Sequence, residues 1–229
     1  PPRGRLEVNG RGEPVYGGRD EVDLAELKRL GLPFWLAGGA GSPAALEAAL
    51  AAGAAGVQVG TLFACAKESG FDPDLKRRIL AEVRAGRADV LTDLRASPTG
   101  FPFKVVQLEA TCSEPERYLE RQRICDLGYL RTPYRREDGR IGFRCPAEPA
   151  EAYVKKGGAL EETRGRKCMC NALLAAAGHA QLREDGPELP LVTAGDCLVD
   201  LHAFLNGRDS YSAGEAIDWL LSGVAAAAC

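Results

Sequence analysis

The segments PFWLAGG, residues 33–39, and GVQVGT, residues 56–61, decide the fold of this chain, because each is an apolar run that ends in a glycine turn. Between them, Ser42 and Pro43 are typical of a helix start, as N-cap and first helical residue, and Gly53 is typical of a helix end. The order is therefore strand, glycine turn, helix, strand, glycine turn. A parallel repeat of this kind brings both turns to the same edge of a sheet.

Both turns are candidate phosphate-binding loops. Backbone N–H groups at helix starts hold a phosphate dianion without any basic side chain, and in an eight-fold (β/α) barrel the loops after strands 7 and 8 often do so. A glycine turn by itself is more often an ordinary turn or a helix entry. Here the two turns lie one βα period apart, and Thr61 adds a hydroxyl donor to the second. We therefore expect them to bind the phosphate of flavin mononucleotide (FMN) or of a phosphorylated substrate.

The composition limits the class of protein. The chain has 229 residues, of which 45% are hydrophobic and 27% charged, and its net charge is −3. These values are typical of one or two soluble globular domains. The sequence has neither a basic field for nucleic acid nor an apolar run long enough to span a membrane. We therefore expect a cytoplasmic protein that binds a small-molecule substrate, while the oligomeric state is not predicted.

The expected fold is α/β, in two parts. Residues 1–86 are expected to be the C-terminal portion of a flavin-binding TIM (β/α)8 barrel, with strands 7 and 8, and residues 87–229 a mostly helical, irregular, cysteine-containing extension. Because the chain starts at Pro1 and its only methionine is Met169, we expect the preceding barrel strands to be missing from it. The sequence predicts helices over 23–30 and 74–85. Two more are predicted to start at capping boxes, one at Ser113/Glu116 that continues to Leu127 and one at Ser212/Glu215 that continues to Leu221. An irregular stretch is expected over 129–166.

Cysteines gather in the second part. Five of the eight lie between Cys112 and Cys170, and Cys125, Cys145, Cys168 and Cys170 are candidate ligands of one metal, with zinc favoured over an iron–sulfur cluster. A metal would hold together a region with few periodic apolar residues. The C-x-C spacing is tighter than that of a zinc finger, and small buried thiols are the simpler alternative. Disulfides are not expected in a reducing compartment.

Two groups of segments resemble a known family. Residues 32–39 and 54–61 look like the last two strands of the nitronate monooxygenase family, formerly called 2-nitropropane dioxygenases. Thr92 and Asp93 followed by residues 97–104, together with residues 123–130 and 165–171, resemble one subgroup of that family, which carries a long C-terminal extension.

The resemblance implies a TIM barrel that holds FMN non-covalently and oxidises alkyl nitronates with O₂ to a carbonyl compound and nitrite. It implies that the FMN phosphate binds to Gly38 and Gly39 after strand 7 and to Gly60 and Thr61 after strand 8. The family's catalytic histidine belongs to a loop after strand 6, upstream of these segments, and neither His179 nor His202 matches it. The chain is therefore expected to lack the catalytic base and to be inactive alone, and its catalytic residues are not predicted.

Two other functions stay open at this point. A flavin-dependent enoyl reductase uses a similar barrel and phosphate site, with hydride delivered by a nicotinamide donor, so rapid anaerobic bleaching by NADH or NADPH would favour it. The second alternative is that the chain is a non-catalytic remnant, which the expected absence of the preceding barrel strands favours.

Overall fold

The computed structural model describes residues 7–18 and 20–227, and it shows a mixed α/β protein whose described strands form two-stranded sheets. Contacts between Cα atoms divide the chain into two compact units. Unit 1 consists of Pro1–Val15 and Leu91–Thr193, and unit 2 of Tyr16–Val90 and Ala194–Cys229. The expected TIM barrel stays a prediction, because it needs strands beyond those described.

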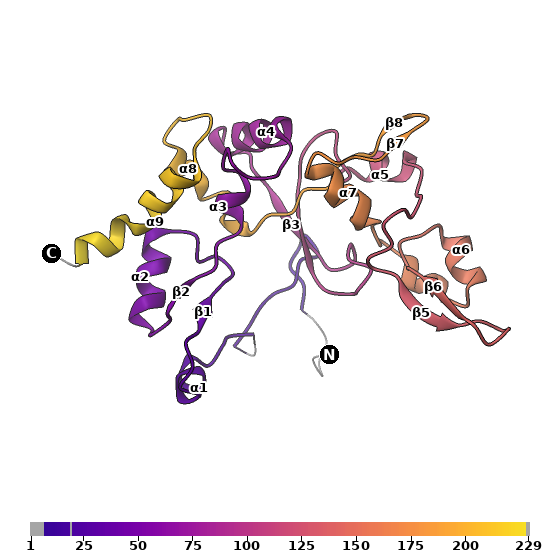
Figure 1. Ribbon diagram of the computed structural model, residues 1–229, viewed down its shortest axis with the longest axis horizontal. Coiled ribbons are helices and arrows are strands. Elements are labelled where there is room, and N and C mark those ends of the chain that lie inside the picture. Colours follow the sequence, from indigo (N-terminus) through magenta and orange to yellow (C-terminus); the bar gives the residue numbers. More distant parts are fainter. Residues whose placement is uncertain (1–6, 19, 228–229) are drawn as a thin grey trace. The chain divides into compact units, whose positions relative to one another are not determined.

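Unit 2 contains the two glycine turns. Its elements are α1 (Leu24–Arg29), β1 (Trp35–Leu36), α2 (Pro43–Ala51), β2 (Gly56–Val57), α3 (Thr61–Ala64), α4 (Pro73–Arg84), the 3-10 helix η2 (Asp196–Leu198), α8 (Leu201–Leu205) and α9 (Ala213–Ala227) (Figure 1).

The predicted strand–helix–strand repeat is confirmed. Strands β1 and β2 pair in parallel, with Trp35 opposite Gly56, and the Gln58 N–H extends the ladder by donating to the Leu36 carbonyl at 2.8 Å. Helix α2 starts where the sequence predicts, because the Ser42 hydroxyl accepts the Ala45 N–H at 3.2 Å. The strands have two residues each and are shorter than the apolar runs suggested.

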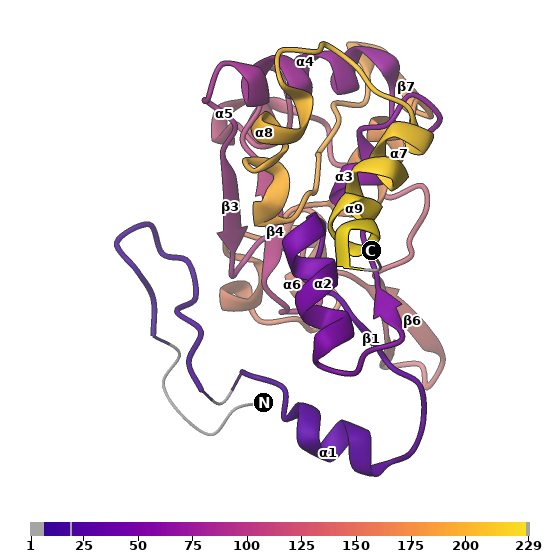
Figure 2. The same cartoon turned by 90° about the vertical axis from the view of Figure 1, so that its left-hand side faces the viewer.

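Helices from the C-terminal part of the chain pack against α2, α3 and α4. Helix α9 runs beside α2 in both Figure 1 and Figure 2, and α8 contacts α4. The Tyr211 side chain is fully buried, and its hydroxyl donates to the Leu62 carbonyl at 2.5 Å. Its ring meets Phe204 edge to face, with centroids 4.8 Å apart. Residues 194–227 therefore complete the core that residues 16–90 begin.

The start of α9 confirms a predicted capping box. The Glu215 carboxylate accepts the Ser212 N–H at 2.7 Å, and the Ser212 hydroxyl accepts the Glu215 N–H at 3.2 Å. The helix continues past Leu221, the predicted end, to Ala227.

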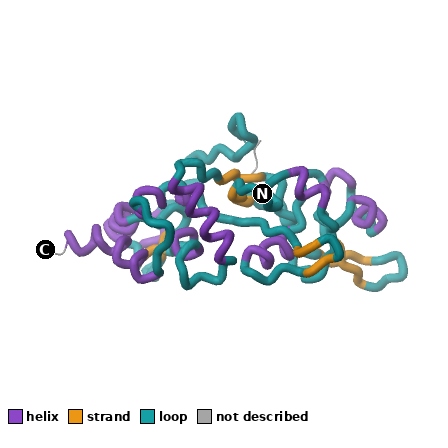
Figure 3. Tube along the Cα trace, turned by 90° about the horizontal axis from the view of Figure 1, so that it is seen from above, coloured by secondary structure: helices purple, strands orange, loops and turns teal. Residues whose placement is uncertain are grey.

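Unit 1 consists of short elements joined by loops, as the orange and teal segments of Figure 3 show. From the boundary with unit 2 onward they are β3 (Val90–Asp93), β4 (Phe103–Val106), α5 (Pro115–Glu120), β5 (Thr132–Arg135), β6 (Ile141–Arg144), α6 (Ala150–Lys155), the 3-10 helix η1 (Leu160–Thr163), α7 (Met169–Ala176), β7 (Leu182–Arg183) and β8 (Gly186–Pro187). One core cluster of this unit consists of Val105, Cys112, Tyr118, Met169, Ala172 and Leu191.

The prediction of a long helix after Ser113 was wrong. Helix α5 has Glu114 as its N-cap and ends at Glu120 rather than Leu127. The Ser113 hydroxyl is buried, and its oxygen accepts the Leu108 N–H at 3.1 Å, so this oxygen does not cap the helix. Arg121, the residue after the helix, is extended, with ψ 143°.

The prediction of an irregular stretch over 129–166 was also wrong, because β5 and β6 form an antiparallel hairpin there. Its turn is closed by the Arg136 N–H, which donates to the Arg140 carbonyl at 2.8 Å. Gly139 has φ +79°, a backbone conformation that glycine adopts readily. The Asp138–Gly139 pair was the turn signal that the sequence reasoning missed.

Candidate functional site

The two glycine turns leave the β1–β2 pair at the same end of the strands. Gly38 and Gly39 follow β1 with φ +79° and +87°, in the left-handed region that other residues avoid. Gly60 precedes α3 as its N-cap. The two loops pack together just before Gly60, since a Cβ on Gly41 would lie 3.3 Å from Cγ1 of Val59. The structure therefore brings together the two turns that the sequence singled out.

The backbone at these turns is accessible. Gly38, Gly39 and Gly60 are exposed, and a Cβ on any of them would have no atom within 4 Å. Among the residues that the structure describes, no hydrogen-bond acceptor is found for the N–H groups of these three glycines. Exposed N–H donors on a backbone without side chains are what a phosphate requires for close approach.

Thr61 is buried beside the second turn, with 8% of its surface exposed. Its Oγ1 accepts the Gly195 N–H at 2.8 Å. Because this bond occupies a lone pair of the oxygen, the hydroxyl proton stays available for donation to a ligand. Thr61 thus keeps the donor capacity that the sequence analysis assigned to it.

A third segment, Gly195 and the following helix η2, belongs to this site and was missed by the sequence analysis. A Cβ on Gly195 would lie 3.2 Å from the Thr61 Oγ1 and 3.4 Å from the Cys197 Sγ. The same sulfur would lie 4.0 Å from a Cβ on Gly41. The available signal was a glycine soon after the apolar pair Leu191–Val192, since the other two turns also place a glycine after an apolar run.

The four cysteines predicted as metal ligands all lie in unit 1. Cys125 follows α5, Cys145 directly follows β6, and Cys168 and Cys170 are the N-cap and second residue of α7. Burial raises the pKa of the Cys145 thiol to about 11. No three His, Cys, Asp or Glu side chains form a metal site within residues 7–18 and 20–227, so the predicted metal site stays a prediction.

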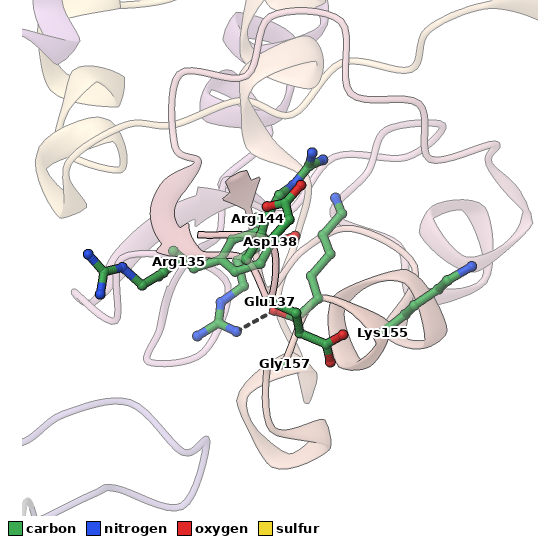
Figure 4. Close-up of a pocket in the computed structure, with 9 residues that line it drawn as sticks. Arg135, Glu137, Asp138, Arg144, Lys155 and Gly157 are labelled. Carbon is green, nitrogen blue, oxygen red and sulfur yellow. Dashed lines mark hydrogen bonds between the residues drawn. The ribbon is translucent and has the colours of Figure 1, made fainter. Parts of the chain in front are cut away.

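A cationic pocket lies at the end of the β5–β6 hairpin and α6 (Figure 4). Arginine and lysine provide five of its lining side chains, namely Arg135, Arg136, Arg144, Lys155 and Lys156, against Glu137 and Asp138. The Arg144 guanidinium donates to the Lys156 carbonyl at 2.7 Å, the dashed line in Figure 4. It also lies over the rings of Tyr134 and Tyr153, 5.2 and 5.3 Å from their centroids. Arg144 therefore fixes the hairpin to α6.

A buried ion cluster connects α5 to the β7–β8 hairpin. The side chains of Arg121 and Glu188 are 5% and 2% exposed and form an ion pair. Arg183 lies 3.6 Å from the second Glu188 oxygen and also pairs with Asp126. Burial raises the pKa of Glu188 even though both arginines favour its ionised form. This cluster therefore holds Arg121 and Asp126 in place, which precede and follow Cys125 in the sequence.

The two histidines are exposed, and His202 lies on α8. The catalytic residue therefore stays unassigned.

Two thiols outside the cysteine group are expected to be unreactive. Burial raises the pKa of Cys65 to about 12 and that of Cys112 to about 11, so both carry a proton at pH 8, and only the thiolate is nucleophilic. We expect their alkylation by iodoacetamide at pH 8 to be at least about a hundredfold slower in the folded protein than in urea. Peptide mapping of alkylation against time measures this. Equal rates in both states would show that the two thiols are open to solvent.

No helix in the described part of the chain is long and apolar enough to cross a membrane. Comparisons of the chain with known protein families, with curated proteins and with solved structures find no match.

Proposed function

We propose that residues 33–61 are the phosphate-binding segment of an FMN-dependent oxidoreductase, with β1 and β2 as the last two strands of its barrel. The observation that carries this proposal is the parallel β1–β2 pair, which ends in two exposed glycine turns whose N–H groups have no acceptor among the described residues. The proposed reaction, oxidation of an alkyl nitronate by O₂ to a carbonyl compound and nitrite, is supported by the resemblance of residues 32–39 and 54–61 to nitronate monooxygenases.

Each residue of the site has a physical role in this proposal. The N–H groups of Gly38, Gly39 and Gly60 donate to phosphate oxygens, which approach the backbone closely because no side chain intervenes. Thr61 donates its hydroxyl proton, oriented by the bond from Gly195. Bound FMN supplies the redox chemistry, while the protein supplies anchoring and orientation.

Comparing FMN with riboflavin tests the phosphate site, because the two ligands share the ring system and differ in the phosphate. We expect the chain to bind FMN more tightly than riboflavin. We expect Gly60→Val to weaken FMN binding by about tenfold or more, because the added side chain occupies the phosphate volume and removes a charge-assisted hydrogen bond worth about 1.5–3 kcal/mol. Riboflavin binding is expected to be unchanged. Quenching of flavin fluorescence measures both affinities.

Gly70→Val is the matched control. Gly70 lies in the same unit, and a Cβ there also has no atom within 4 Å and no positive φ to oppose it. We expect this variant to bind FMN like the unaltered chain. Equal affinity of the unaltered chain for FMN and riboflavin would overturn the phosphate assignment, as would equal losses in the two variants. Anaerobic reduction of bound flavin by NADPH would instead support the enoyl reductase.

A further inference from the structure

The cationic pocket of unit 1 takes no part in the FMN site proposed above, which belongs to unit 2. Its volume is about 730 Å³, within the range of pockets that bind small molecules. Five cationic side chains line it against two carboxylates, a surplus of three positive charges, although the net charge of the whole chain is −3. The pocket is therefore a local positive site on an acidic protein.

The charges of this pocket are largely without counter-charges. Among the described residues, only one of the five cations has a carboxylate partner, since Glu148 lies 2.5 Å from the Lys156 ammonium group. Arg135, Arg136 and Lys155 are exposed, and no side-chain hydrogen bond or ion pair joins them to another described residue. A hollow lined by charges of one sign attracts ions of the opposite sign.

The two lining carboxylates do not take up these charges. Asp138 lies in the hairpin turn, where its Oδ1 accepts the Arg140 N–H at 3.0 Å. Neither Asp138 nor Glu137 forms an ion pair within the part of the chain that the structure describes. The cations thus keep their N–H donors for a ligand.

The hairpin wall of the pocket is held by Arg144 through a single hydrogen bond, the one to the Lys156 carbonyl. The other N–H donors of Arg144 have no acceptor among the described residues. A Cβ on Gly157 would lie 3.3 Å from its Nη1, so the loop after α6 approaches the guanidinium closely where a side chain is absent. Arg144 is therefore fixed in position while most of its donors stay open (Figure 4).

The α6 wall is held by Tyr153, which is 4% exposed. Its hydroxyl donates to the Glu162 carboxylate at 2.9 Å, and the same oxygen accepts the Ala159 N–H at 3.1 Å. Lys155 and Lys156 follow Tyr153 at the end of the helix, so a buried residue positions both. Walls that are fixed without a ligand reduce the entropy lost on binding.

We propose that the cationic pocket binds a small molecule that carries a chain of two or more phosphate groups. Guanidinium groups bind phosphate through parallel N–H donors, and ammonium groups bind it as point charges. Three arginines and two lysines, on two elements, offer more donors than one phosphate group can accept. The size of the pocket favours a small ligand over nucleic acid, which needs a basic stripe along a surface.

Isothermal titration calorimetry of the full chain with inorganic tripolyphosphate tests the proposal. We expect tripolyphosphate to bind about tenfold or more tightly than orthophosphate, because the longer anion reaches cations on both walls. The affinity is expected to fall as the salt concentration rises, since salt screens charge pairs at a surface. Gly60→Val is expected to leave it unchanged, which separates this pocket from the FMN site.

Arg136→Gln and Lys155→Gln remove one cation from each wall. Both side chains are exposed and have no partner among the described residues, so neither substitution is expected to disturb the fold. Each is expected to weaken tripolyphosphate binding by about tenfold, the loss of one charge-assisted hydrogen bond. Arg140→Gln is the matched control, because Arg140 is exposed in the same turn but does not line the pocket. It is expected to change the affinity by less than about twofold, since a cation outside the pocket acts only through screened charge.

Chemical protection locates the ligand without any substitution. Phenylglyoxal modifies accessible guanidinium groups, and mass spectrometry of peptides measures the rate at each arginine. We expect tripolyphosphate to slow the modification of Arg135 and Arg136 several-fold and to leave that of Arg140 unchanged.

Three results would overturn the proposal. The first is the absence of tripolyphosphate binding, or its loss in Gly60→Val, which would place the anion at the glycine turns. The second is an equal effect of Arg136→Gln and Arg140→Gln. The third is binding of single-stranded RNA that Arg136→Gln weakens and tripolyphosphate does not displace, which would assign the cations to nucleic acid.

Discussion

Glu188→Ala is expected to lower the free energy of unfolding of unit 1 by about 3–5 kcal/mol, because the substitution leaves the buried Arg121 guanidinium without its carboxylate partner. The charge on Arg121 stays in a site from which water is excluded, since only 5% of its side chain is exposed. Losing a partner from a buried pair costs far more than losing one from a pair at the surface. Urea unfolding followed by circular dichroism, with hydrogen exchange of the α7 amides, measures the loss.

Glu184→Ala is the control for this substitution. Glu184 is exposed and lies four residues before Glu188, so removing its carboxylate is expected to change stability by less than about 0.5 kcal/mol. Equal effects of the two substitutions would show that the Arg121–Glu188 pair is open to water. The double replacement Arg121→Met with Glu188→Leu is expected to recover part of the loss, because it removes both charges together.

Lys76→Met is expected to destabilise unit 2 by about 2–4 kcal/mol, because one buried ammonium group satisfies three backbone carbonyls. Lys76 is 9% exposed, and its Nζ donates to the carbonyls of Ala66, Lys67 and Ser69 at 3.1, 2.9 and 3.1 Å. These bonds fix the loop between α3 and α4. Methionine keeps most of the side-chain volume and removes the donors.

Tryptophan fluorescence during urea unfolding reports on this variant, since both tryptophans, Trp35 and Trp219, belong to unit 2. Lys67→Met serves as the comparison, because the Lys67 side chain is exposed in the same loop and is expected to contribute little. A stability for Lys76→Met within error of that for Lys67→Met would mean that water replaces the ammonium group at the three carbonyls.

The sequence predicted those elements whose signals are local. Ser42 and Pro43 specify the start of α2, and the Ser212–Glu215 pair specifies the start of α9, because each cap is formed by residues within one helical turn. The parallel pairing of β1 with β2 follows from one short helix between two apolar runs. These signals were enough to place Gly38, Gly39, Gly60 and Thr61 on neighbouring turns.

Elements that depend on distant partners were not predicted. Ser113 has the pattern of an N-cap, but its hydroxyl turns to the Leu108 carbonyl inside the core, a choice that packing decides. The contribution of Gly195 to the site at the glycine turns arises from a hydrogen bond to Thr61, 134 residues away in sequence. No periodicity within a window of ten or twenty residues contains such a contact.

The division of the chain into units sets an order of events during synthesis. Residues 91–193 interrupt unit 2, whose two parts meet through α2 with α9 and α4 with α8. During translation, residues 16–90 emerge before residues 91–193, and α8 and α9 emerge after both. The faces of α2 and α4 that contact α9 and α8 therefore have no partner until the end of the chain has been made. A long stretch of translation thus separates the two halves of unit 2, and in that interval its apolar surfaces are open to chaperones or to aggregation.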